Sequence, residues 1–311
     1  MAKNNEQESP KKRYFTMFII LIALLIFSMM IAFFFNIGNE DTTAYNTAII
    51  SVNGVITADD GTTFFSDSTA SSTDIIKSIT RAENDPNVKA VIFEINSPGG
   101  SPVATDEISQ AIKSLNKNKT TVAWIRETGA SGAYWIATST KHIIANRMSI
   151  VGSIGVIGSY IEWYGLMNKY NVTYERLVSG EYKDTGTPYR PLSSYEESML
   201  QSKLDKLHEI FIEAVAENRN MSIENVRALS NGEIYLGIEA KENGLIDELG
   251  SKDEVIKYLE NNLNITVQTK EFSSKKTFLE SLMSAMNKNS FYVGRGISSG
   301  LVQDSGLKIT T

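Results

Sequence analysis

An uncharged, mostly apolar run of 22 residues, from Tyr14 to Phe35, constrains this chain more than any other feature. As a helix rising 1.5 Å per residue, the run is about 33 Å long, and the hydrocarbon core of a bilayer is about 30 Å thick. Basic residues precede the run and acidic residues follow it: Lys3, Lys11, Lys12 and Arg13 come before it, and Glu40, Asp41, Asp59 and Asp60 come after it. The positive-inside rule therefore predicts a single-pass anchor in the cell membrane, with the N-terminus in the cytoplasm and residues 36–311 outside.

A cleaved signal peptide and a buried core helix are the alternatives for this run. A signal peptide usually has an apolar region of about 7–15 residues that ends at a small-residue cleavage site. Here the run is longer and ends in three phenylalanines. A buried core helix would not explain the asymmetry of the flanking charges, so the sequence favours an uncleaved anchor.

The composition excludes several chemistries. The chain has no cysteine, which excludes thiolate nucleophiles, disulfides and cysteine-based zinc sites. It has two histidines, His142 and His208, so a site built on clustered imidazoles is not expected. The net charge of −6 argues against a nucleic-acid-binding protein, which would normally carry a basic surplus. We expect no metal and no cofactor.

The rest of the chain alternates between strand-like and helix-like segments. Strands are predicted at 48–56, 88–95, 120–126 and 142–145, a further strand-like run spans 172–178, and helices are predicted at 73–84, 102–117, from 132 onward, and at 194–219. Such alternation indicates βαβ units, that is, an α/β fold with a mainly parallel sheet and flanking helices. The expected organisation is a cytoplasmic tail (1–13), the anchor (14–35), a linker (36–46), one folded domain (47–265), and a C-terminal amphipathic segment and flexible tail (266–311).

Two glycine-containing turns follow predicted strands. The first, Ser97-Pro98-Gly99-Gly100, allows positive φ and close approach of a ligand to the backbone. The second, Gly129-Ala130-Ser131-Gly132, places a serine at a strand-to-helix turn, as in a nucleophile elbow. Taken alone, the first is a plain turn and Ser131 is a helix N-cap.

A serine nucleophile needs a base, and the residues leave more than one candidate. His142 and His208 have no evident carboxylate partner in the sequence. A Ser–Lys dyad is the other route, with Lys183 in Ser179-Gly180-Glu181-Tyr182-Lys183 as the candidate. Taken alone, Lys183 would be an ordinary surface lysine.

Together the motifs resemble the signal peptide peptidase A family, Ser–Lys membrane peptidases of the ClpP/crotonase superfamily. The runs INSPGGSP, ETGASGAYWIA, IVGSIGVIG, SGEYKDTGTPYRPLS and GEIYLGIEAKENGLIDELGSKDE follow the family's order, and the resemblance spans roughly residues 46–260. It implies a ClpP/crotonase-like fold behind one N-terminal transmembrane helix.

The resemblance also assigns roles to residues. It implies that Ser131 is the nucleophile and Lys183 the general base, that Gly100 and Gly132 form the oxyanion hole, and that Ser153 orients the lysine. Ala133 departs from the family, which often has a second glycine there, but this change removes no catalytic group. A lysine accepts a proton only when it is neutral, and its reference pKa is about 10.4. A carboxylate facing the base would oppose proton loss, so we expect Asp184 to point away from it.

The implied function is a serine endopeptidase that cleaves hydrophobic peptides, such as cleaved signal peptides, at the extracytoplasmic membrane face. A crotonase-like acyl-CoA enzyme shares the fold, but a domain outside the cell would meet little CoA. A catalytically inactive membrane scaffold or binding protein of the same fold is the other alternative. In the family, the serine and lysine of one site come from different copies of the domain. One copy per chain therefore implies a homo-oligomer with active sites shared between protomers.

Overall fold

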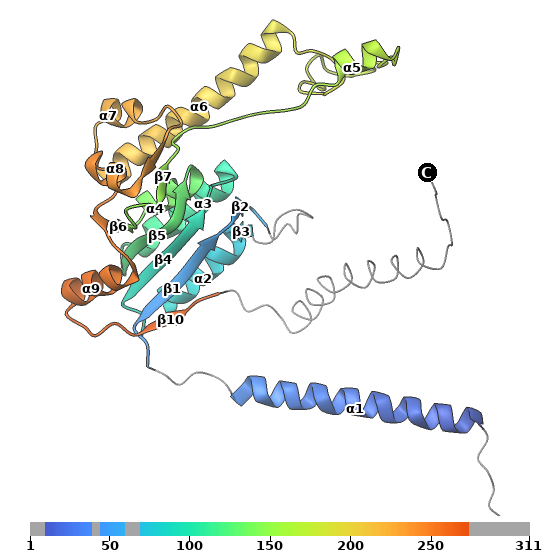
Figure 1. The fold of residues 1–311 in the computed structure, drawn as a ribbon, viewed down its shortest axis with the longest axis vertical. Coiled ribbons are helices and arrows are strands. Elements are labelled where there is room, and N and C mark those ends of the chain that lie inside the picture. Colours follow the sequence, from blue (N-terminus) through green and yellow to red (C-terminus); the bar gives the residue numbers. More distant parts are fainter. Residues whose placement is uncertain (1–9, 39–43, 60–68, 274–311) are drawn as a thin grey trace, which may run out of the picture. The chain divides into compact units, whose positions relative to one another are not determined.

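The computed structural model describes residues 10–38, 44–59 and 69–273, and the chain divides into two units, 1–44 and 45–311. The first unit contains helix α1 (Pro10–Gly38), which includes the whole apolar run (Figure 1). Its side chains are exposed throughout Tyr14–Ile31, and the helix is long and apolar enough to cross a membrane. The apolar run therefore forms a continuous helix of the kind a membrane anchor needs.

The second unit is built on a sheet that is mainly parallel (Figure 1). Its strands are β1 (Thr47–Asn53), β4 (Ala90–Ser97), β5 (Thr120–Ala130), β6 (His142–Ala145), β7 (Ile150–Gly152), β8 (Ile234–Leu236), β9 (Glu248–Leu249) and β10 (Thr269–Glu271). The order is β10-β1-β4-β5-β6-β9, with every neighbouring pair parallel. The end of β5 also pairs with β7, which pairs with β8 in antiparallel orientation. The predicted α/β class with a mainly parallel sheet is confirmed.

Helices cover both faces of this sheet because alternate strand residues point to opposite sides. On one face, α2 (Ser72–Asn84), α3 (Pro102–Leu115) and α4 (Gly132–Thr138) share a buried cluster with the strands. On the other face, α9 (Lys252–Leu263) packs through Val255 and Leu259 onto β4 and β5. Besides the long helix α6, which is described below, the remaining elements are β2 (Val55–Thr57), β3 (Thr69–Ser71), α5 (Tyr164–Lys169), α7 (Ile223–Ala228) and α8 (Gly237–Glu242).

Parallel pairing brings the two glycine-containing turns together. β4 and β5 are neighbours, so their carboxyl ends lie at the same edge of the sheet, with Ser97 opposite Gly129. Each strand leads directly into a helix, β4 into α3 and β5 into α4. This edge therefore holds both candidate motifs, as expected for a ligand site in an α/β sheet.

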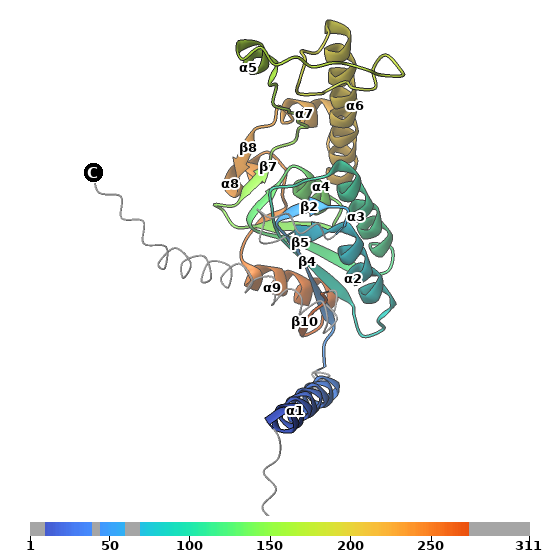
Figure 2. The ribbon, with the colours of Figure 1, turned by 90° about the vertical axis from the view of Figure 1, so that its right-hand side faces the viewer.

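The long helix α6 (Ser194–Arg219) has the predicted bounds. Its sequence places apolar residues at a spacing of 3–4, which predicts one apolar stripe and a solvated reverse face: Tyr195, Met199, Leu200, Leu204, Leu207, Ile210, Phe211, Ala214 and Val215. It begins with a capping box between Ser193 and Glu196, and it ends at Asn220 in the left-handed conformation. In its C-terminal part, Phe211, Ile212, Val215 and Ala216 are buried. Its N-terminal part extends away from the sheet in both views (Figures 1 and 2). The apolar stripe is therefore buried at one end of the helix and largely uncovered at the other.

The structure differs from three of the predictions about strands and segment bounds. Gly54, with φ of 82°, separates the predicted strand 48–56 into β1 and β2. Residues 172–178 form no strand, and Leu177 is almost fully exposed, because no neighbouring strand supplies backbone partners in the described part of the chain. β10 extends the sheet past residue 265, and the expected tail from residue 274 lies outside the described residues.

Candidate active site

Ser131 occupies an uncommon backbone conformation between β5 and α4. Its φ is 52° and its ψ is −125°, a combination that is costly for any residue with a Cβ atom. Hydrogen bonds hold it there: its N–H donates to the Gly152 carbonyl at 2.8 Å, and its carbonyl accepts from Trp135 N–H at 3.1 Å. The sharp turn is the geometry of a nucleophile elbow, which exposes a serine hydroxyl at the end of a strand.

Gly99, in the first turn, packs directly against the second. A Cβ atom on Gly99 would lie 2.8 Å from Gly132 N and 2.9 Å from Ser131 Cβ. Gly99 also has φ of 97°, and its N–H donates to the Ser97 hydroxyl at 3.1 Å. The next residue, Gly100, lies against the backbone of Ile56 so closely that a side chain would collide with the Ile56 carbonyl. Both positions thus require glycine, and the contact fixes the Gly99–Gly100 turn beside Ser131.

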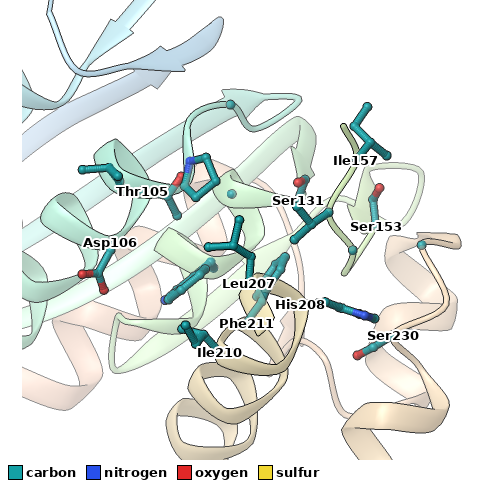
Figure 3. A pocket seen from close by; sticks show the side chains of 18 of the residues that line it. Thr105, Asp106, Ser131, Ser153, Ile157, Leu207, His208, Ile210, Phe211 and Ser230 are labelled. Atoms are coloured by element: carbon teal, nitrogen blue, oxygen red, sulfur yellow. The ribbon is translucent and has the colours of Figure 1, made fainter. Parts of the chain in front are cut away.

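A cavity of about 770 Å³ opens at this junction (Figure 3). Ser131, Gly100, Gly132 and Ser153 all line it. The other lining side chains are mainly apolar and include Val103, Trp135, Val156, Ile157, Leu207, Ile210 and Phe211. Trp135 and Phe211 stack with ring centroids 5.1 Å apart, which joins α4 to α6 in the wall of the cavity. The cavity suits an apolar ligand that places a reactive carbonyl near Ser131.

Ser153 reaches the cavity from the segment that follows β7. Its φ is 50°, and its N–H donates to the Glu233 carbonyl at 2.8 Å. Preceding Gly152 supplies the carbonyl that holds Ser131. The same short segment therefore positions both serines at one opening.

Lys183, in contrast, is exposed on a turn and is not among the described residues that line the cavity. Its turn is connected to the N-terminal end of α6, because Thr185 donates a hydrogen bond to Glu196 at 2.8 Å. Eleven residues of helix separate Glu196 from Leu207 in the cavity wall, a distance of about 16 Å along the axis. Within one chain the structure thus brings together Ser131, Gly100, Gly132 and Ser153, and leaves Lys183 apart from them.

Two arginines hold the carboxylate of Asp184, the residue after Lys183. Arg176 donates to both of its oxygens at 2.8 Å, and Arg190 donates to them at 3.0 and 3.1 Å. These hydrogen bonds, Arg176's first, keep the pKa of Asp184 well below its usual range. Arg190 likewise lowers the pKa of Glu196, which also accepts hydrogen bonds from Ser193 and Thr185. The arginines therefore favour the ionised form of both carboxylates.

The two histidines occupy different places. His142 stacks on Tyr258 at 3.9 Å and lies near Asp247 and Glu248, and it is not among the residues lining the cavity. His208 does line the cavity, and its Nε2 has no hydrogen-bond partner among the described residues. No hydrogen bond joins it to Ser131 in the described part of the chain, so no serine–histidine pair is formed there.

Thr105 belongs to the cavity wall but was not predicted from the sequence. Its side chain is 1% exposed, lines the cavity and lies so close to Gly132 that a Cβ atom there would collide with the hydroxyl. The hydroxyl has no hydrogen-bond partner in the described residues. Leu207 and Phe211 were predicted only as parts of an apolar stripe, because periodicity identifies a buried face without naming what it packs against.

Known proteins are similar in sequence to parts of this chain. Residues 113–266 match peptidase family S49. A protein of Methanocaldococcus jannaschii, provisionally named a protease, is 37% identical over 59% of this chain and 59% of its own length. A protein of Enterococcus faecium, provisionally named signal peptide peptidase SppA, is 29% identical over 84% of this chain and 73% of its own length. Protease 4 of Haemophilus influenzae is 32% identical over 70% of this chain, which spans 35% of that longer protein.

Proposed function

Because the chain belongs to peptidase family S49, the family of the signal peptide peptidase A proteins, we propose that it is a membrane-anchored serine endopeptidase. Ser131 is its nucleophile. The observation that carries the proposal is the strained conformation of Ser131, held against two glycine turns at the mouth of an apolar cavity. A residue kept in such a conformation by its surroundings is a mark of a functional site.

The reaction runs in two steps at Ser131. A base takes the hydroxyl proton as Oγ attacks the peptide carbonyl, and the N–H groups of Gly100 and Gly132 stabilise the oxyanion. The base then gives its proton to the leaving amine, and an acyl-enzyme remains. A water molecule deprotonated by the same base hydrolyses this ester and regenerates Ser131.

Lys183 of a second copy of the chain serves as the base, and Ser153 orients it. The length of α6 supports this. About 16 Å of helix separates Glu196, to which the turn with Lys183 is hydrogen-bonded, from Leu207 in the cavity wall, and this is longer than a lysine side chain. The uncovered apolar stripe of α6 and the exposed Leu177 supply surface that a neighbouring copy can bury. Each active site is thus assembled from two protomers of a homo-oligomer.

The substrates are hydrophobic peptides such as cleaved signal peptides. The apolar wall built from Trp135, Leu207 and Phe211 favours apolar side chains next to the scissile bond. Helix α1 anchors the enzyme in the cell membrane with the catalytic unit on the extracytoplasmic face, where such peptides remain after export.

A serine-reactive probe tests this function against the alternative of a catalytically inactive scaffold or binding protein. A fluorophosphonate should label the wild-type chain and fail to label Ser131→Ala, and only the wild type should cleave a synthetic signal peptide. Lys183→Ala should abolish turnover, whereas His208→Gln should retain it within about tenfold, a barrier change of about 1.4 kcal/mol. Folded wild-type oligomer without labelling or cleavage would establish the inactive protein instead.

A further inference from the structure

The turn that carries Lys183 is held by a network of four charged side chains. Arg190 is at its centre and contacts both carboxylates: Asp184 at 3.0 and 3.1 Å, and Glu196 at 2.6 and 2.9 Å. Arg176 completes it through Asp184 and also donates to the Glu181 carbonyl at 2.6 Å. With two guanidinium groups and two carboxylates, the network has no net charge.

The network is anchored to the start of α6. The Glu196 side chain accepts from the Ser193 N–H at 2.9 Å as part of the capping box, and it is only 4% exposed. Thr185 and Arg190 therefore bind a carboxylate that is itself fixed to the helix. Charge-assisted, bidentate contacts of this kind restrict both distance and orientation. The turn with Lys183 consequently has a defined position relative to α6.

The charged groups near the turn with Lys183 lie on the turn itself, on the chain that flanks it on both sides, and on α6. Glu181 and Asp184 lie on its own turn, Arg176 precedes the turn, and Arg190 follows it. Glu196 joins them from α6, where Tyr195 also packs against Tyr182 with ring centroids 5.0 Å apart. Among these groups, Asp184 is the residue next to Lys183 in the sequence. A carboxylate near a lysine favours the protonated form, which cannot accept a proton.

We propose that Arg190 is a positioning residue for the general base: it neutralises Asp184 beside Lys183 and fixes the turn to α6. This inference rests on the proposed role of Lys183. Arg190 acts in two separable ways, by its charge and by its fork of hydrogen-bond donors. Lysine at position 190 retains the charge without the fork, and glutamine removes the charge.

The test is the pH dependence of kcat/KM for the full-length oligomer with a synthetic signal peptide. Arg190→Gln leaves the network with one excess negative charge, so the midpoint of the rising limb should move up by about 0.5–1 pH unit. Asp184→Asn leaves one excess positive charge and should move the midpoint down. The double variant should return it to the wild-type value. Arg190→Lys should keep the midpoint and lower kcat. A merely structural role would change the amount of active enzyme but not these midpoints.

Control variants distinguish the role of Arg190 from the role of Lys183 as the base. Arg227→Gln removes the arginine of the Arg227–Glu209 pair, which joins α7 to α6 away from the Lys183 turn, and should leave the midpoint unchanged. In 1 M salt, where the Debye length is about 3 Å, the shifts should shrink. If Arg190→Gln has no measurable activity, the midpoint of the pH profile of Asp184→Asn is the deciding measurement. An unchanged midpoint in Asp184→Asn, while Lys183→Ala is inactive, would overturn the role of Arg190 and leave Lys183 as the base. Activity in Lys183→Ala would overturn the proposed function itself.

Discussion

Ser131, the proposed nucleophile, has a strained backbone conformation. Its φ of 52° exposes the hydroxyl at the end of β5, and the Gly152 carbonyl and the first turn of α4 maintain the conformation. Backbone strain of this kind is worth about 1–3 kcal/mol. The fold is therefore less stable than its core packing alone would make it, and the strain is located at Ser131.

Two substitutions at Ser131 separate strain from chemistry. Ser131→Ala and Ser131→Gly should both abolish peptide cleavage, because neither has a hydroxyl. Glycine tolerates positive φ and alanine does not, so Ser131→Gly should be more stable than Ser131→Ala by about 1 kcal/mol. Denaturant unfolding of the two purified variants measures the difference. Equal stabilities would mean that the conformation of Ser131 is not strained.

The sequence indicated some site residues more directly than others. The glycines around Ser131 mark a sharp turn in any chain, so the turn could be predicted from local chemistry. Nothing local distinguishes Lys183 from a surface lysine, and its assignment rests on the family resemblance. Thr105 could not be predicted, because its proximity to Gly132 arises only when α3 and α4 pack together.

At the scale of elements, the site depends on two strand-to-helix turns that touch each other. Gly99, before α3, lies within van der Waals distance of the backbone that begins α4. The backbone of each turn therefore limits the space that is open to the other. The position of the nucleophile is therefore a property of the β4–β5 pair and its two helices.

Gly99→Ala tests this contact, with Gly180→Ala as its matched control. Both glycines have nearly the same positive φ, 97° and 96°, but a Cβ atom on Gly180 meets nothing within 4 Å. Gly180→Ala should therefore cost only the backbone strain, about 1 kcal/mol, whereas Gly99→Ala should cost about 2–4 kcal/mol and abolish cleavage. Thermal and denaturant unfolding would measure both values. Similar losses of unfolding free energy in the two variants would show that the contact between the two turns does not contribute to stability.

Strands and helices were predicted best where local signals in the sequence set their bounds. Residues 142–145 and 194–219 have the predicted bounds, since hydrophobic periodicity and capping residues are local signals. The run 172–178 has the composition of a strand but has no partner strand among the described residues, and the local sequence cannot indicate whether such a partner exists. The same holds for the half of the α6 stripe that stays uncovered.

At the scale of the whole molecule, one chain holds the proposed nucleophile, Ser131, at the cavity, whereas the proposed base, Lys183, is not among the described residues that line it. α6 links the two regions, because its C-terminal part lines the cavity and its N-terminal end holds the turn with Lys183. A head-to-tail arrangement of copies can bring the base of one to the serine of the next, and it must close into a ring or grow into a filament.

Mixing two inactive variants tests whether sites are shared. Ser131→Ala and Lys183→Ala chains should each be inactive alone. Co-assembled at random in a 1:1 ratio, they should recover about a quarter of wild-type activity, because a quarter of the shared sites keep both residues. Cleavage of a synthetic signal peptide by co-expressed, doubly tagged oligomers measures the recovery. Persistent inactivity in oligomers shown to contain both variants would place the two residues in the same chain.

The pairing of β1 with β10 has a consequence for biosynthesis. The first strand of the sheet aligns Thr47 with Thr269, and Asn46 holds Gln268 across a separation of 222 residues. A ribosome adding about 5–20 residues per second needs on the order of 10–45 s to make that length of chain. During this interval the edge of β1 has no partner, although the segment that forms α1 has long since been made. The nascent chain thus carries an open sheet edge for much of its synthesis, and any chaperone or protease that recognises unpaired strands has that interval in which to act on it.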